Sequence, residues 1–165
     1  MDAELHKILL KKAGALLAHR PYSRGELQER LAKLAEEPQV ECVLDRLEQL
    51  NLLNDADYAY NFALYRIRQD GWGPTKICQS LLRRHVAQAT IDSALERIGN
   101  ELGQEPILIE YIKRRCGKKG LPTDRGGIRK LVMHLHQRGF DEDRILSALK
   151  KMIPAAVLHR FETGE

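Results

Sequence analysis

The chain has 165 residues, of which 43% are hydrophobic, 30% are charged and only 5% are aromatic. That length suits one domain or a short array of small units, and so few aromatic residues are atypical of β-sandwiches and barrels. No run of about 18 apolar residues is present, so no membrane span is expected, and the mixed-charge start does not resemble a secretory signal. Three cysteines without a CxxC pair indicate reduced thiols and a cytoplasmic protein.

The net charge of +4 is distributed unevenly along the chain. Residues 1–54 carry a net charge of −1, residues 55–100 carry +1 and residues 101–165 carry +4. An acidic partner, such as a nucleic acid, is therefore expected to bind the later parts of the chain.

The first predicted helix follows an apolar stripe over residues 5–17, and Pro21 ends it. Ser23 and Glu26 have the spacing of a capping box, which predicts that a second helix begins there. A third helix is expected along the apolar stripe over residues 40–50.

The second set of helices is expected to begin at Asn54, a favourable N-cap residue. Tyr58, Phe62 and Tyr65 share one face of its first helix, and we expect this face to pack in the core. For Tyr65, stacking on unpaired bases is the alternative. The stretch 71–74 reads Gly-Trp-Gly-Pro and ends that helix, since proline suits the first position of the next one. The predicted core of this set contains Tyr58, Phe62, Ile77, Leu81, Ile91 and Leu95.

In the third set, Gly117 is expected to end the first helix. Gly139 is expected to follow the second helix in the left-handed conformation, and Asp141 to cap the third. Residues 154–165 are a tail for which a further short helix is left open.

The three sets of helices repeat one another. A shift of 54 residues superimposes apolar positions of the second set on those of the third and places Arg84 on Arg138, whereas a shift of 50 places Leu27 on Ile77. The predicted fold class is all-α, with tandem three-helix repeats forming an elongated array that can curve, and such arrays usually bind partners. The predicted repeats are residues 1–53, residues 54–100 and residues 101–165, the last with the C-terminal tail.

Motifs for catalysis are absent from the sequence, which contains no GxxxxGK[ST], GxGxxG, GxSxG or HExxH. His134 and His136 lie two residues apart, which on a helix gives them nearly opposite faces, so they are not expected to share a metal ion. The cysteines lie beside apolar residues with no cluster to activate them. We therefore expect neither enzymatic activity nor a cofactor or metal.

Two segments are strongly basic. Residues 66–84 hold five basic residues and one acidic residue, and residues 113–130 hold eight and one. Such segments can neutralise phosphates and release counterions, and the alternative is a solvated helix surface. Trp72 is a candidate either for stacking on unpaired bases or for ordinary packing. The candidate binding residues are Arg66, Arg68, Lys76, Arg83, Arg84, Lys113, Arg114, Arg115, Lys118, Lys119, Arg125, Arg129 and Lys130.

Three stretches carry a resemblance to a known family. Residues 20–27 read Arg-Pro-Tyr-Ser-Arg-Gly-Glu-Leu, residues 53–81 contain Leu-Asn-Asp, Tyr-Ala and Gly-Pro-Thr-Lys-Ile, and residues 138–141 read Arg-Gly-Phe-Asp. With these motifs the chain resembles the RecX family, regulators of the RecA recombinase, over about residues 5–152. It departs from the family's pattern at His85, where a glycine is usual.

The resemblance implies tandem three-helix repeats and a non-enzymatic cytoplasmic regulator of recombination, DNA repair and the SOS response. It implies binding to RecA filaments on DNA, along the groove or at the end, which limits filament growth and lowers the ATPase, strand-exchange and co-protease activities of RecA. It also implies direct binding of single- and double-stranded DNA.

The residues alone leave two alternatives open. One is a helix-turn-helix DNA-binding transcriptional regulator, and the other is a protein-binding scaffold without affinity for nucleic acid. A transcriptional regulator of this kind dimerises to read two half-sites, and no dimerisation zipper is visible in the sequence. We therefore expect a monomer.

Overall fold

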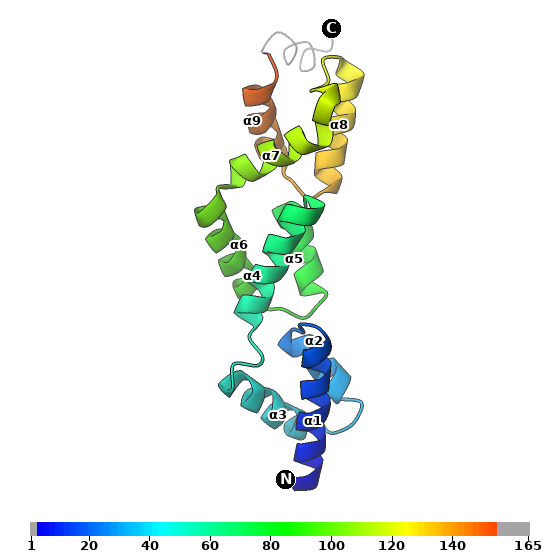
Figure 1. Cartoon of the computed structure of the whole chain (residues 1–165), viewed down its shortest axis with the longest axis vertical. Helices are drawn as coiled ribbons and strands as arrows, with labels where there is room; N and C mark the ends of the chain where they lie inside the picture. Colours follow the sequence, from blue (N-terminus) through cyan, green and yellow to red (C-terminus); the bar gives the residue numbers. More distant parts are fainter. Residues whose placement is uncertain (1–2, 155–165) are drawn as a thin grey trace. The chain divides into compact units, whose positions relative to one another are not determined.

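The computed structural model describes residues 3–154, and these residues form helices and connecting turns without a strand (Figure 1). The predicted all-α class is confirmed. The helices are α1 (Ala3–His19), α2 (Arg24–Leu31), α3 (Glu37–Gln49), α4 (Asp55–Tyr65), α5 (Pro74–Leu82), α6 (Gln88–Leu102), α7 (Gln104–Cys116), α8 (Arg125–Gln137) and α9 (Glu142–Met152). A π-helix, η1 (Arg66–Asp70), follows α4, and a 3₁₀-helix, η2 (Gly117–Lys119), follows α7. The helix considered for the tail lies outside the described residues.

The chain forms two compact units. Unit 1 comprises Met1–Phe62 and Ser80–Ala94, and unit 2 comprises Ala63–Gln79 and Leu95–Glu165. The division falls within α4, α5 and α6. The boundaries of the three predicted repeats stay a prediction.

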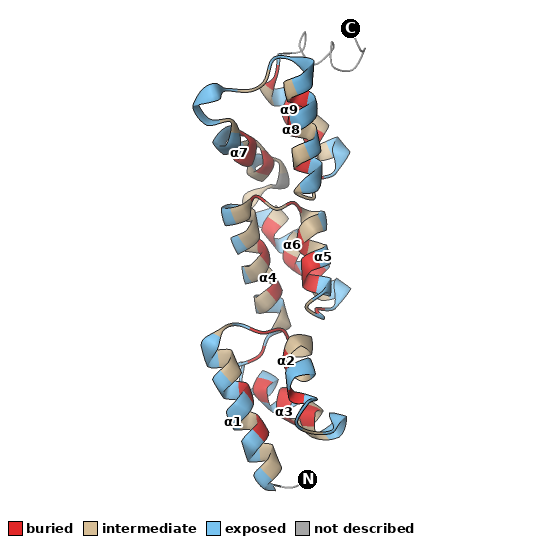
Figure 2. Cartoon of the chain, turned by 90° about the vertical axis from the view of Figure 1, so that its right-hand side faces the viewer, coloured by how far each residue is buried: buried red, intermediate tan, exposed pale blue. Residues whose placement is uncertain are grey.

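In unit 1, helices α1, α2 and α3 pack against one another around the predicted apolar stripes. Figure 2 shows buried and exposed positions alternating along these helices, as amphipathic helices require. The predicted capping box at the start of α2 is confirmed: Ser23 Oγ accepts from the Glu26 amide, and the Glu26 carboxylate accepts from the Ser23 amide. The core of unit 1 contains Leu9, Ala13, Tyr22, Leu27, Leu31, Val40, Val43, Leu44, Leu47 and Leu53.

In unit 2, helix α9 packs against α7 and α8. The predicted helix ends are confirmed: Gly117 ends α7, Gly139 follows α8 with φ at +89°, and the Asp141 carboxylate accepts a hydrogen bond from the Arg144 amide. These local signals fix where the helices turn. The buried residues of this core are Leu108, Tyr111, Ile112, Ile128, Leu131, Leu135, Phe140, Ile145, Ala148, Leu149 and Ile153.

Helix α4 begins as predicted but buries a different face. Asn54 Oδ1 accepts hydrogen bonds from the amides of Ala56 and Asp57, as expected of an N-cap. The buried residues of α4, however, are Ala59 and Ala63. The buried stripe is thus rotated by one residue, about 100°, from the predicted aromatic face.

The aromatic residues of α4 lie at the edge of that stripe. Tyr65 is 59% exposed, so its predicted place in the core was wrong. Tyr58 and Phe62 are half-buried. The Tyr58 hydroxyl donates a hydrogen bond to Glu26, and the Arg84 guanidinium lies 5.0 Å from the Phe62 ring centroid, so each ring is covered on one side by polar groups. Of the other predicted core residues, Ile77, Leu81 and Ile91 are buried and Leu95 is half-buried.

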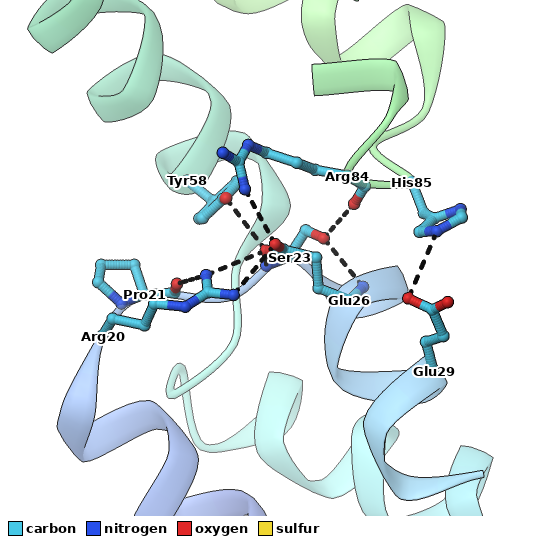
Figure 3. Close-up of polar contacts among 8 residues, drawn as sticks. All are labelled: Arg20, Pro21, Ser23, Glu26, Glu29, Tyr58, Arg84 and His85. Atoms are coloured by element: carbon cyan, nitrogen blue, oxygen red, sulfur yellow. Dashed lines mark hydrogen bonds and ion pairs between the residues drawn. The ribbon is translucent and has the colours of Figure 1, made fainter. Parts of the chain in front are cut away.

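One carboxylate in unit 1 joins the turn between α1 and α2 to α4 and to the end of α5 (Figure 3). Glu26 accepts hydrogen bonds from Arg20 at 3.2 Å, from the Tyr58 hydroxyl at 3.1 Å and from Arg84 at 3.0 Å, and its side chain is only 14% exposed. Ser23 Oγ also donates to the backbone carbonyl of Arg84. Although partial burial acts to raise it, the hydrogen bonds from Arg20 and Ser23 hold the pKa of Glu26 below its ordinary value.

The backbones meet closely in this contact, which we call the first joint. A Cβ atom at Gly25 would overlap the Cβ of His85. His85 itself adopts the left-handed conformation, with φ at 58°, which is uncommon for a residue other than glycine. The turn between α5 and α6 therefore packs closely against the start of α2, with no room for a larger residue at position 25.

We expect Glu26→Gln to lower the free energy of unfolding by about 1–3 kcal/mol, because it removes a charged acceptor shared by two arginines. Urea unfolding followed by circular dichroism measures this loss. Because the pKa of Glu26 is lowered in the folded protein, its stabilisation is present at neutral pH and is lost as the pH falls through that lowered pKa, below 4.5. The difference between wild type and variant should shrink over the same range.

The matched control is Glu29→Gln on the same helix. Glu29 is exposed and lies 3.8 Å from His85, so its loss should change stability by less than about 0.5 kcal/mol. Equal losses from the two variants would contradict a special role for Glu26.

Candidate nucleic-acid interface

Unit 2 contains a second joint of the same kind, in which the turn between α8 and α9 meets the segment between η1 and α5. The Gly73 amide donates to the carbonyl of Arg138 at 2.7 Å, and the Thr75 amide donates to that of Gly139 at 3.2 Å. Arg138 Nη1 donates to the carbonyl of Asp70 at 2.8 Å. A Cβ atom at Gly73 would overlap the backbone of Gly139, so glycine is required here.

The two joints differ in charge. The repeat shift of 54 residues places Arg84 on Arg138, and the shift of 50 residues places Glu26 on Lys76. In the first joint the arginine meets a carboxylate, whereas in the second the equivalent arginine donates to a backbone carbonyl and a lysine replaces the glutamate. The second joint is therefore the more positive of the two.

Trp72 holds two cations beside this joint. Its ring centroid lies 4.7 Å from Arg66 Cζ and 4.9 Å from Lys76 Nζ, within the range of cation–π attraction. Arg66 also forms an ion pair with Asp70 at 2.6 Å. The π-helix η1 carries Arg66 and leads directly into this turn, and π-helical turns are frequent at functional sites.

Helix α7 adds further cations. Arg114 Nη1 donates to the carbonyl of Arg68 at 2.8 Å, and its guanidinium lies 5.8 Å from the Tyr111 ring centroid. Arg68 and Arg114 also line one cavity of about 450 Å³. We call the cations of this region the basic cluster: Arg66, Arg68, Lys76, Arg114, Arg115 and Arg138.

His134, on α8, contacts Tyr111 of α7. Its Nε2 lies 2.8 Å from the Tyr111 hydroxyl, and the two rings are stacked with centroids 6.1 Å apart. Burial lowers the pKa of His134, and the positive charges of Arg115, Arg138 and Lys76 lower it further. The imidazole is thus mainly neutral at pH 7.

The structure brings some of the predicted binding residues together and separates others. Five of them, Arg66, Arg68, Lys76, Arg114 and Arg115, lie in the basic cluster with Trp72. The sequence analysis missed Arg138 because no other lysine or arginine lies within five residues of it. Its alignment with Arg84 and its place in the Arg-Gly-Phe motif could have marked it as a candidate. Arg84 belongs to unit 1, where it pairs with Glu26.

The remaining predicted residues are exposed, and their role in binding stays a prediction. Lys113 lies beside Cys116 in another cavity, of about 610 Å³. Lys118 and Lys119 lie on η2, and Arg83 lies in unit 1 at the end of α5. The exposed basic residues on α8 are Arg125, Arg129 and Lys130.

Other kinds of site find little support in residues 3–154. No group of His, Cys, Asp and Glu side chains in this range could hold a metal ion. None of the helices described here combines the length and the apolar character that a membrane crossing needs. Cys42, Cys78 and Cys116 are all half-buried thiols without a disulfide.

Comparison with known proteins relates the chain to one family. Residues 54–95 match the family model described as RecX, second three-helix domain. The regulatory protein RecX of Pseudomonas fluorescens is 37% identical over 131 residues, which cover 79% of this chain and 82% of the relative. That of Clostridioides difficile is 27% identical over 154 residues, which cover 93% and 72%. A crystal structure of RecX from Lactobacillus salivarius shares the fold, with a TM-score of 0.76 at 21% identity over 91% of this chain and 97% of that one.

Trp72→Leu tests what the indole does, given the sequence-based prediction that the basic segments, which include Arg66 and Lys76, bind DNA. For single strands, log affinity should fall linearly with log salt, at about −0.7 for each phosphate contact. If Trp72 positions Arg66 and Lys76, the variant should bind more weakly and its slope should be shallower by up to about 1.4. If the ring stacks on bases, affinity should fall with an unchanged slope.

We expect the shallower slope, measured by fluorescence anisotropy with labelled oligothymidine at several salt concentrations. Tyr60→Leu, on α4 in unit 1, is the control and should keep the wild-type slope. An unchanged slope in the Trp72 variant would contradict the positioning role.

Proposed function

Because the chain belongs to the RecX family of regulatory proteins, we propose that it binds RecA filaments on DNA and inhibits RecA. The observation that carries this proposal is the 37% identity to a RecX protein over 79% of the chain. RecX proteins are regulators and not enzymes, so the activity is one of binding. Its proposed effect is to limit filament growth and thereby to lower the ATPase, strand-exchange and co-protease activities of RecA during recombination and DNA repair.

The basic cluster supplies the proposed contact with the DNA backbone. Arg114 and Arg138 are each anchored through one N–H group to a backbone carbonyl. A guanidinium has five N–H donors, so the anchored arginines keep donors that can bind phosphate. Anchoring also lowers the conformational entropy lost on binding, which favours affinity.

The first joint shows how an anion can bind at the equivalent place in the second joint. There, a carboxylate accepts hydrogen bonds from Arg84 and Arg20. At the equivalent position of the second joint the chain has Lys76, and no negative side chain replaces Glu26 at that position. We infer that a DNA phosphate supplies the missing negative charge.

Inhibition then follows from linkage. A ligand that prefers one state of a filament shifts the equilibrium toward that state, by as much as its affinities for the two states differ. If this chain binds a filament that has stopped growing more tightly than a growing one, it limits growth without any chemical step.

Charge reversal at Arg68 and Arg115 tests this proposal. Both side chains are exposed members of the basic cluster, so Arg68→Glu/Arg115→Glu should leave the fold intact. Each lost charged contact is worth about 1.5–3 kcal/mol. We therefore expect DNA affinity to fall at least about tenfold, with a parallel loss of inhibition of the ATPase of RecA on single-stranded DNA.

The control is Lys11→Glu/Lys12→Glu on α1, where both lysines are exposed and the change in net charge is the same. A local contact predicts that this variant inhibits like the wild type. Equal losses from both variants would indicate a net-charge effect instead. A wild-type chain that binds one duplex sequence but leaves the RecA ATPase unchanged would favour a transcriptional regulator and contradict the proposal.

A further inference from the structure

The cavity that Arg68 and Arg114 line in unit 2 also has an apolar wall, which phosphate binding does not use. Its volume of about 450 Å³ lies within the range of about 300–1,000 Å³ that is usual for ligand sites. Gly103, with φ at +70°, is the single residue between α6 and α7, so the chain turns sharply there and both helices contribute to the wall. The apolar residues of the wall are Ile67, Leu102, Pro106 and Ile107.

Three charged side chains line the same cavity: Arg68 from η1, and Glu110 and Arg114 from α7. Arg114 Nη1 donates to the carbonyl of Arg68 at 2.8 Å, which ties α7 to η1 at the cavity. Glu110 is exposed and lies about one helical turn before Arg114. Tyr111 completes the lining, but its hydroxyl already lies 2.8 Å from His134 Nε2. The cavity thus combines an apolar wall with guanidinium donors and one carboxylate, which only accepts hydrogen bonds.

We propose that this cavity binds one unpaired base of single-stranded DNA and that it prefers guanine. The inference deepens the proposed function and rests on it, since Arg68 and Arg114 belong to the basic cluster that contacts the DNA backbone under that proposal. Unpaired bases stack on guanidinium planes and on apolar side chains in other nucleic-acid-binding proteins. The basic cluster then holds the backbone while the cavity beside it holds a base.

The charged groups of the cavity favour guanine among the four bases. Guanine presents two neighbouring donors, N1–H and the N2 amino group, which match the two oxygens of the Glu110 carboxylate. Its O6 and N7 atoms are acceptors, which arginine can bind. Thymine has its one N–H group between two carbonyl oxygens, and adenine and cytosine each have an acceptor nitrogen next to the amino group. Each of these three bases would therefore turn a lone pair toward the carboxylate.

The first test compares the affinity of the wild-type chain for labelled oligothymidine and for the same oligomer carrying isolated guanines, too far apart to form quadruplexes. We expect the guanines to raise affinity at least about fivefold, as one bidentate base contact does. The slope of log affinity against log salt should stay the same, because no phosphate contact is added. Replacing each guanine with inosine, which lacks the N2 amino group, should remove most of the gain without any change to the protein.

The second test uses Glu110→Gln, an exposed substitution that should leave the fold intact. Because it removes a negative charge beside the basic cluster, affinity for oligothymidine should stay equal or rise, while most of the gain from guanine is lost. A misfolded variant would instead lose affinity for both oligomers. Glu142→Gln on α9 is the matched control, since Glu142 is exposed and the change in charge is the same, and it should keep the wild-type gain.

Three results would overturn the guanine site while leaving phosphate binding by the basic cluster in place. They are equal affinity of the wild type for both oligomers, an undiminished gain with inosine, and a Glu110→Gln variant that keeps the full gain from guanine. The first of them would favour a protein side chain as the occupant of the cavity. A wild-type chain that binds neither oligomer would overturn the proposed function as well.

Discussion

A buried backbone carbonyl that follows the last turn of a helix needs a hydrogen-bond donor from another part of the chain. Each unit contains one hydrogen bond of this kind. In unit 1 the carbonyl of Arg84 accepts from Ser23, and in unit 2 that of Arg138 accepts from Gly73. Contacts this close leave no room for a side chain at the meeting point, which explains Gly25 at the start of α2 in unit 1 and Gly73 before α5 in unit 2. Because the accepting carbonyl belongs to the arginine itself, the same contact also limits where that arginine can place its guanidinium.

The charge on the facing residue then decides what each joint can do. Glu26 receives hydrogen bonds from Arg84, Arg20 and Tyr58, so in the first joint a carboxylate of the chain itself pairs with both arginines and serves stability. Lys76 adds a positive charge to Arg138, and Trp72 holds that lysine in place. One framework thus yields a structural contact in unit 1 and, under the proposed function, a phosphate-binding contact in unit 2.

Features set by neighbours in the sequence were predictable, and features set by distant contacts were not. The capping box at Ser23 and the left-handed Gly139 depend on a few adjacent residues, and both were found as predicted. The buried face of α4 depends on which neighbours it meets, and periodicity alone could not show that Ala59 would be buried and Tyr65 exposed. Likewise, the run of basic residues on α7 was evident, but Arg138 joins them only because α8 ends at the η1–α5 turn.

The substitution Lys76→Glu tests most directly whether the missing carboxylate creates the binding site. It gives the second joint the acidic residue that Glu26 provides in the first, next to an equivalent arginine. We predict that affinity for single-stranded DNA falls at least about tenfold, while the midpoint of thermal unfolding does not decrease, because the new carboxylate pairs with Arg138. Lys11→Glu, with the same change in net charge, should bind like the wild type. A Lys76→Glu variant that binds DNA as tightly as the wild type would contradict the assignment of this joint to phosphate binding.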